Sequence, residues 1–136
     1  MADYFTNFSV VLPLTKEQQE EAIKLVKQVE AYRTENEPLP ATFPDSLRDV
    51  VEDWLFETEP GEDGLWLNSQ SGGQEAACAF IQHLLQQYDF TLFVALEWSH
   101  DCSKPLTDPF GGGAAFITST EIETMTTSEW LRKMSC

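Results

Sequence analysis

The chain has little positive charge, few cysteines and histidines, and no long apolar run. Of its 136 residues, eight are Lys or Arg, 23 are Asp or Glu, three are Cys and two are His. No apolar run approaches the roughly 18 residues that a membrane helix needs. The N-terminal stretch MADYFTNFSVV lacks the basic and apolar regions of a signal peptide. We therefore expect a cytoplasmic protein that does not enter a membrane.

The shortage of basic residues leaves a formal net charge of −15. Nucleic acids and anionic membranes both bind basic patches, so we expect no direct contact with either. An acidic surface instead attracts basic surfaces and steers their approach. A second interpretation, that the charge serves solubility alone, stays open.

The cysteines and histidines are too few and too scattered to form a metal site. Cys78, Cys102 and Cys136 are an odd number with wide spacing, and they contain no C-x-x-C pair. His83 and His100 add only two further metal-binding side chains. We predict neither a disulfide framework nor a metal, and no cofactor.

The hydrophobic pattern predicts one α+β domain over residues 1–136. Apolar residues alternate in strand-like runs and recur at helical spacing in others. The order β, α, α, β, α, β, β, α favours a two-layer sandwich of a mostly antiparallel sheet with helices packed on it, and a ferredoxin-like arrangement is one form of it. The strand order stays open. The expected elements are strands at 6–14, 64–69, 90–98 (buried on both faces) and 114–125, and helices at 15–33, 45–56, 71–89 and 127–134.

Several helix starts carry a side chain that suits an N-cap. A capping box pairs a Ser or Thr with a Glu or Gln three residues later. The first helix is expected to use Thr15 with Gln18, and the third Ser71 with Gln74. The last helix is expected to be capped by Thr127 or Ser128.

The negative charge is concentrated between Glu35 and Asp63, where ten acids stand beside one base, Arg48. The second expected helix turns its apolar residues to one side, and the stretch ETEPGEDG after it is expected to form an acidic turn. As a solvated helix face this segment is ordinary, and as a presented surface it suits a basic partner. The candidate interaction residues on the outer face are Asp45, Asp49, Glu52 and Asp53.

The stretch WSHDCSKPLTDPFGGGAAF, residues 98–116, gathers unusual residue types between two apolar runs. Neighbouring residues of a strand point in alternate directions, which disfavours a nucleophilic site at Cys102 or Ser103. A phosphate loop needs a helix after its glycines, whereas these lead into a strand. We expect a structured hairpin connection. The candidate ligand-site residues within it are Trp98, His100, Cys102, Lys104, Gly111 and Gly112.

Three stretches resemble a family of small uncharacterised proteins from phage, plasmid and bacterial genomes. They are LNSQSGGQEAACAFIQHLLQQYD, WSHDCSKPLTDPFGGGAAFIT and TTSEWL. The resemblance covers residues 64–131, with a weaker match at TNFSVVLPL, and its most specific elements are W-x3-C-S-K-P and F-G-G-G-A. It implies a bacterial or mobile-element context, and it implies no activity, cofactor or catalytic residue.

Two functions are open at this point. The first is a non-enzymatic interaction protein whose acidic surface engages a basic protein partner. One form of it is an inhibitor that occupies the groove of a nucleic-acid-handling protein, with carboxylates standing where phosphates would stand. The alternative is a small-ligand-binding protein or enzyme that uses the hairpin at 98–116. No catalytic residue is predicted for either, and the oligomeric state is left open.

Overall fold

The computed structural model describes residues 3–105 and 110–135, and within them six strands form one antiparallel sheet beside four α-helices. The strand order is β2-β3-β1-β4-β5-β6. This confirms the predicted α+β architecture of a mostly antiparallel sheet with helices packed on it. The strands are β1 (Tyr4–Leu12), β2 (Glu57–Pro60), β3 (Leu65–Ser69), β4 (Val94–Cys102), β5 (Gly111–Ile117) and β6 (Ile122–Thr126). The helices are α1 (Lys16–Glu35), α2 (Asp45–Arg48), the 3₁₀ turn η1 (Val51–Asp53), α3 (Gln74–Tyr88) and α4 (Thr127–Ser135).

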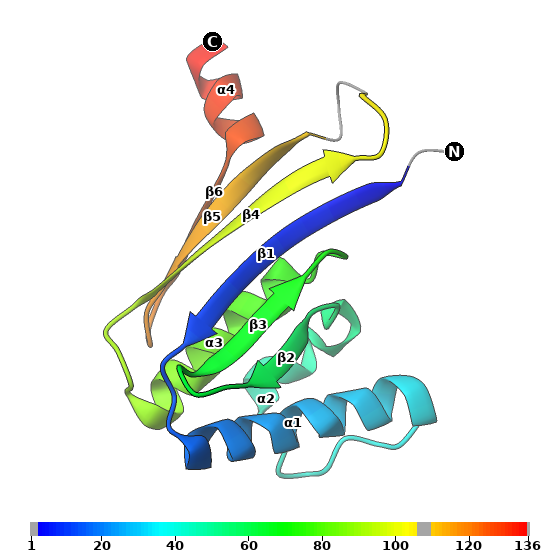
Figure 1. Cartoon of the computed structure of the whole chain (residues 1–136), viewed down its shortest axis with the longest axis vertical. Coiled ribbons are helices and arrows are strands. Elements are labelled where there is room, and N and C mark those ends of the chain that lie inside the picture. The colour runs from blue at the N-terminus through cyan, green and yellow to red at the C-terminus, as the bar shows by residue number, and fades with distance from the viewer. Residues whose placement is uncertain (1–2, 106–109, 136) are drawn as a thin grey trace.

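The first four strands follow a ferredoxin-like connectivity. The chain runs β1-α1-β2-β3-α3-β4, and these strands lie in the order β2-β3-β1-β4, all antiparallel to their neighbours. Strands β5 and β6 then extend the sheet beyond β4, and α4 projects past its end (Figure 1). The molecule is thus a ferredoxin-like unit with a second part, β5-β6-α4, attached through β4.

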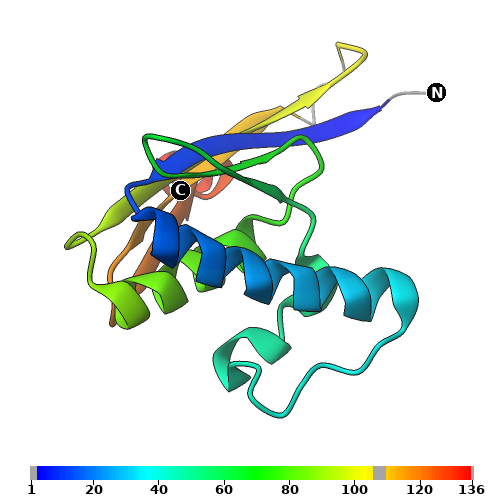
Figure 2. The ribbon, with the colours of Figure 1, turned by 60° about the horizontal axis from the view of Figure 1, so that its bottom comes forward.

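Helices α1, α2 and α3 lie on one side of the sheet, so its other face is open (Figure 2). Strand β4 shows this directly, because Val94, Leu96 and Trp98 are buried while Ala95 and Glu97 between them are exposed. The prediction that this strand is buried on both faces is therefore wrong. Ala95 is small, and Glu97 carries a charge that stays in solvent.

Helix α1 begins with the predicted capping box. The Gln18 backbone N–H donates to Thr15 Oγ1 at 3.2 Å, and the Thr15 N–H donates to Gln18 Oε1 at 3.0 Å. The next residue, Gln19, is buried, and its Nε2 donates to the carbonyl oxygens of Leu14 (2.9 Å) and Gly61 (3.1 Å). Its Oε1 accepts from the Gly61 N–H at 3.0 Å. A fully bonded buried amide thus ties α1 to the turn between β2 and β3.

The second predicted helix, residues 45–56, is wrong in extent. Only the four residues of α2 and the three of η1 are helical. Trp54 then stacks on Phe56, with ring centroids 4.9 Å apart, and meets the ring of Phe80 edge-on at 5.0 Å. The apolar spacing that suggested one helix reflects two short turns that deliver aromatic rings to the core.

The predicted acidic turn is also partly wrong, because its first four residues form the edge strand β2. This strand pairs only with β3, placing Glu57 opposite Asn68 and Glu59 opposite Trp66. Charged side chains and a proline such as Pro60 are typical of edge strands, where they prevent pairing with another chain. The same residues have low strand propensity, which concealed the strand in the sequence.

The N-termini of α3 and α4 are capped by residues other than those predicted. The capping box of Ser71 with Gln74 does not form, since α3 has no cap from a residue just before it and starts after Gly73 (φ 81°). Instead, Asp53 Oδ2 accepts from the backbone N–H of Ala76, the third residue of α3, at 3.3 Å. In α4 the cap is Thr126, whose Oγ1 accepts from the Glu129 N–H at 3.2 Å. Thr126 lies one residue before Thr127, the first of the two predicted caps, Thr127 and Ser128.

Glycines in β5 make room for the indole of Trp98. A Cβ atom at Gly113 would lie 2.5 Å from Trp98 Cζ2 and 2.7 Å from the Met125 carbonyl oxygen. Trp98 and Gly113 face each other in the β4–β5 pairing, and Trp98 is only 8% exposed. Gly113 therefore allows a large ring to pack closely against the strand.

Among residues 3–105 and 110–135, no helix combines the length and apolar character that crossing a membrane requires.

We predict that Gly113→Ala destabilises the protein, because the added methyl group overlaps the indole and a backbone carbonyl. Overpacking of this kind costs roughly 1–3 kcal/mol in the free energy of unfolding. Urea denaturation followed by tryptophan fluorescence measures it. The matched control is Gly61→Ala, whose Cβ would meet only the Gly64 carbonyl oxygen at 3.3 Å. Equal stability of the two variants would contradict the packing argument.

Candidate functional site

A cavity of about 420 Å³ lies on the helix-covered side of the sheet, between the start of α3 and α4. We call it the His100 pocket. Its wall combines charged, aromatic and hydroxyl side chains from four elements, and polar groups that converge on one cavity are a mark of a ligand site. The lining residues are Gln74, Glu75 and Cys78 of α3, Trp98 and His100 of β4, Ile122, Thr124 and Thr126 of β6, and Glu129 of α4.

The imidazole of His100 is held by strand β1. Thr6 stands opposite His100 in the β1–β4 pairing, and its Oγ1 lies 2.8 Å from Nδ1 of the ring. Among the described residues this is the only hydrogen bond of the ring. The contact fixes the orientation of the imidazole and leaves Nε2 as the nitrogen available to a ligand.

Cys78 also lines this pocket, but its thiol is not set up to react. The side chain is buried, and burial together with the negative charge of Glu75 raises the pKa of Cys78 to about 11. The thiolate is the nucleophilic form of cysteine, and catalytic cysteines have lowered pKa values. Thiol chemistry in the His100 pocket is therefore disfavoured at neutral pH.

We predict that Cys78 alkylates slowly in the folded protein. At pH 8 a pKa of about 11 leaves on the order of a hundredfold less thiolate than an ordinary cysteine has. The measurement is the iodoacetamide rate of a Cys102→Ser/Cys136→Ser variant, whose one thiol is Cys78, in buffer and in urea. The variant that keeps only Cys102 is the control for reagent access. A native rate equal to the rate in urea would contradict the prediction.

The structure brings together some of the predicted ligand-site residues and separates the others. Trp98 and His100 line the pocket, because they lie two residues apart in β4 and so share one face of the sheet. Cys102 is half-buried at the end of β4, opposite Tyr4, and Lys104 is exposed in the segment beyond. Neither of these two lines the pocket. Residues 106–109 of the predicted hairpin connection lie outside the described part of the chain.

The two predicted glycines have backbone roles. Gly111 has φ 137°, a conformation that side chains disfavour. Gly112 donates its N–H to Thr127 Oγ1 at 3.1 Å, and the Thr127 hydroxyl donates to the Gly112 carbonyl oxygen at 3.3 Å. This pair of bonds fastens the first residue of α4 to β5. The glycines therefore position the helix and do not line the pocket.

Sequence reasoning missed seven of the nine pocket residues, namely Gln74, Glu75, Cys78, Ile122, Thr124, Thr126 and Glu129. Gln74 and Cys78 stand at i and i+4 of a confidently predicted helix, so their shared face was readable from the sequence. The sequence does not show that the start of this helix faces Trp98 and His100 of β4 across one cavity. The neighbourhood of α3, β4 and α4 is set by tertiary structure alone.

The four acidic candidates do not form one helical stripe. Asp45 pairs with Arg48, with Oδ1 and Nε 3.0 Å apart, and Asp49 is exposed. Glu52 is exposed and its Oε1 accepts from the Tyr32 hydroxyl at 3.1 Å. Asp53 is half-buried and caps α3. Three of the four are thus available at the surface.

We predict that Asp53→Asn lowers stability whereas Asp49→Asn does not. Asp53 places a negative charge at the start of α3, where the helix dipole favours it. Loss of a cap costs about 0.5–2 kcal/mol, and part of that is expected here because the amide oxygen still accepts. Thermal unfolding of both variants measures the difference. A neutral Asp53→Asn would show that the negative charge of Asp53 at the start of α3 contributes nothing to stability.

Metal binding has no support in the described residues. Within 3–105 and 110–135, no three His, Cys, Asp or Glu side chains are grouped to hold a metal ion. The second histidine, His83 on α3, does not line the His100 pocket. Burial lowers the pKa of His83, which favours the neutral imidazole.

Comparisons of the chain with protein-family models, with curated proteins and with solved structures find no match. The resemblance of residues 64–131 to phage, plasmid and bacterial proteins therefore stays a prediction. The candidate site rests on the geometry of this chain.

Proposed function

We propose that the protein is a non-enzymatic interaction protein that engages a basic protein partner. One observation carries this proposal: the carboxylates have almost no counter-charges. There are 23 acids against eight bases, and in the described part of the chain Asp45 and Arg48 form the one salt bridge. Carboxylates without partners in their own chain are free to pair with cations of another protein.

The acidic segment, residues 35–63, is the surface best suited to that role. It carries ten acids and one base, and nine of the ten acids are exposed, Asp53 being the exception. The segment runs from the end of α1 through α2 to the edge strand β2 (Figure 2). The exposed members are Glu35, Glu37, Asp45, Asp49, Glu52, Glu57, Glu59, Glu62 and Asp63.

A nucleic-acid-handling protein is the partner class that this surface suits. The groove of such a protein is lined by Lys and Arg spaced to meet phosphates, and carboxylates on a folded scaffold offer negative charge to the same groove. Binding of this type weakens as salt screens the charges. The proposal places the protein in the cytoplasm, where Cys78 and Cys102 would remain free thiols, as they are here.

The alternative function, ligand binding or catalysis at the hairpin, has less support. Only two of its six predicted residues, Trp98 and His100, line the His100 pocket. The one thiol in that pocket is Cys78, and its raised pKa disfavours nucleophilic chemistry.

We predict that Asp45→Asn/Asp49→Asn/Glu52→Gln weakens partner binding by about tenfold or more, since three attractive charges are removed. The matched control is Glu17→Gln/Glu20→Gln/Glu30→Gln, which removes three exposed charges from α1, where Lys16, Lys24 and Lys27 already balance them. The partner is recovered from a bacterial lysate at low salt, and its affinity is measured by calorimetry at about 50 and 200 mM salt.

Three outcomes would refute the proposal. They are recovery of no basic protein, an affinity that salt does not change, and equal weakening by the two triple variants. The last outcome would show that only the total charge matters and that the acidic segment is not the contact.

A further inference from the structure

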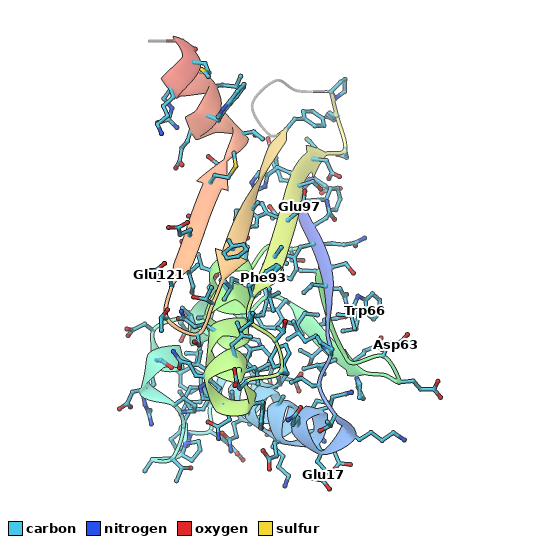
Figure 3. The ribbon with its side chains drawn as sticks, turned by 90° about the vertical axis from the view of Figure 1, so that its left-hand side faces the viewer. Glu17, Asp63, Trp66, Phe93, Glu97 and Glu121 are labelled. Carbon is cyan, nitrogen blue, oxygen red and sulfur yellow. The ribbon has the colours of Figure 1, made fainter. Side chains whose placement is uncertain are left out.

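Strand β6 forms the outer edge of the sheet at the end opposite β2. Within residues 3–105 and 110–135 its one neighbouring strand is β5, so the other side of β6 has no partner strand. In Figure 3, Glu121 marks the turn that leads into this strand. A free edge presents a row of unpaired backbone N–H and C=O groups, and such a row can pair with a strand of another chain.

The two edges of the sheet differ in how they are protected against such pairing. Edge strand β2 carries Glu57, Glu59 and Pro60, and both charges and proline hinder the addition of another strand. Edge strand β6 contains no proline, and Glu123 is its one charged residue. Its remaining residues are Ile, Thr and Met, and the β-branched ones favour strand pairing. The chain thus hinders strand addition at β2 and permits it at β6.

The register of the β5–β6 hairpin identifies the backbone groups that point outward. Thr118 donates its N–H to the carbonyl oxygen of Glu121 at 2.8 Å, so these opposed residues form a hydrogen-bonded pair. Hydrogen-bonded and non-hydrogen-bonded pairs alternate along an antiparallel ladder. The non-hydrogen-bonded pairs of this hairpin are therefore Ile117–Ile122, Ala115–Thr124 and Gly113–Thr126. On β6, the N–H groups of Ile122, Thr124 and Thr126 consequently point away from β5.

A cavity of about 600 Å³ borders the free edge of β6. Thr124 and Met125 both line it, and neighbouring residues of a strand point to opposite faces of a sheet, so the cavity lies beside the strand. Its other wall is α4, which lies toward the helix-covered side of the sheet, where Glu129 also lines the His100 pocket. The lining residues are Thr124, Met125, Thr126, Glu129, Trp130, Arg132 and Lys133. There is thus space for a further strand between the edge of β6 and α4.

We propose that the protein forms a homodimer in which the β6 strands of two copies pair antiparallel across a two-fold axis at Thr124. In this register Thr124 of one copy is opposite Thr124 of the other, and their outward N–H and C=O groups exchange hydrogen bonds. On either side, the outward N–H of Thr126 in one copy faces the carbonyl oxygen of Ile122 in the other. The edge is therefore complementary to a second copy of itself, as an isologous contact requires.

Charge supports a second copy as the occupant of the cavity. Glu121 and Glu123 are exposed acids at the start of β6, whereas Arg132 and Lys133 line the cavity beside its end. Antiparallel pairing brings the start of each β6 to the end of the other, so the acids of one copy approach the bases of its partner. Glu123 is then opposite Met125, and the two copies of Glu123 do not face each other directly.

The same arrangement keeps the acidic segments of the two copies apart, because β2 is at one edge of the sheet and β6 is at the other. Repulsion between two chains of charge −15 is thereby reduced at the contact. The inference goes beyond the proposed function, since it uses the opposite edge of the sheet and a different partner.

The first test is sedimentation velocity of the full chain from roughly 1 to 100 μM, the range in which a weak dimer equilibrium is visible. Thr124→Pro removes the outward N–H from both copies, and proline is tolerated on an edge strand where the N–H faces solvent. We expect this variant to weaken the dimer about tenfold or more, because two hydrogen bonds at the centre of the contact are lost. The matched control, Thr124→Ser, keeps the N–H and should leave the dimer unchanged. Circular dichroism verifies the fold of both variants.

The second test is oxidative cross-linking, which examines the register. In a Cys102→Ser/Cys136→Ser background, which leaves only the buried Cys78, Thr124→Cys places two thiols opposite each other. The Cα atoms of a hydrogen-bonded pair are about 5.5 Å apart, a separation that a disulfide spans. The control is Ile122→Cys, whose two copies would lie four residues apart along the ladder, roughly 13 Å, beyond the reach of a disulfide. We expect Thr124→Cys, and not Ile122→Cys, to give a covalent dimer.

Three results would overturn the proposal. They are a monomer at every concentration, a dimer that a folded Thr124→Pro variant does not weaken, and cross-linking of Ile122→Cys as fast as that of Thr124→Cys. Should Thr124→Pro fail to fold, the cross-linking comparison decides, because neither cysteine variant removes a backbone hydrogen bond.

Discussion

The pairing of β4 with β1 on one side and β5 on the other is the interaction on which the remaining architecture depends. Through β1, the strand joins the ferredoxin-like unit and places Leu96 and Trp98 over the helix-covered core. Through β5, it carries β6 and α4, which make few other contacts with that unit. The glycines of β5 let the Trp98 indole lie flat against this junction. Any loss of the β4–β5 register would therefore separate the two parts and open the His100 pocket, whose wall comes from both.

A sheet covered by helices on one face only leaves its other face to be stabilised by solvent or by a partner. This chain treats the two ends of that face differently. Glu57 and Glu59 charge the edge at β2, where a charged edge resists pairing with other strands. Phe93, Phe116 and Met125 make the opposite end apolar. The charged edge strand and this apolar group lie toward opposite edges of the sheet, although Glu97 and Glu123 border the apolar group.

Elements whose signals are local were predictable from the sequence. The capping box of Thr15 with Gln18 and the apolar stripe behind it define α1, and the alternation around Phe8 defines β1. The failures share one cause, which is a contact between residues far apart in sequence. Asp53 caps α3 from 23 positions away, so a nearby Ser71 looked like the cap. Strand β2 exists because β3 offers it hydrogen-bond partners, although its own residues favour a turn.

The residues around His100 show how the same limit applies to a site. The residue types alone suggested a ligand-binding or reactive site, since His100, Cys102 and Lys104 are close in sequence. Alternation along β4 does place His100 and Cys102 on one face, but α3 reaches only as far as His100, so Cys102 lies beyond the cavity. The thiol that does meet the pocket comes from Cys78, and the burial that brings it there also raises its pKa and suppresses its reactivity. Packing that encloses a thiol without a nearby cation cannot also activate it. The pocket therefore does not present Cys78 as an activated nucleophile.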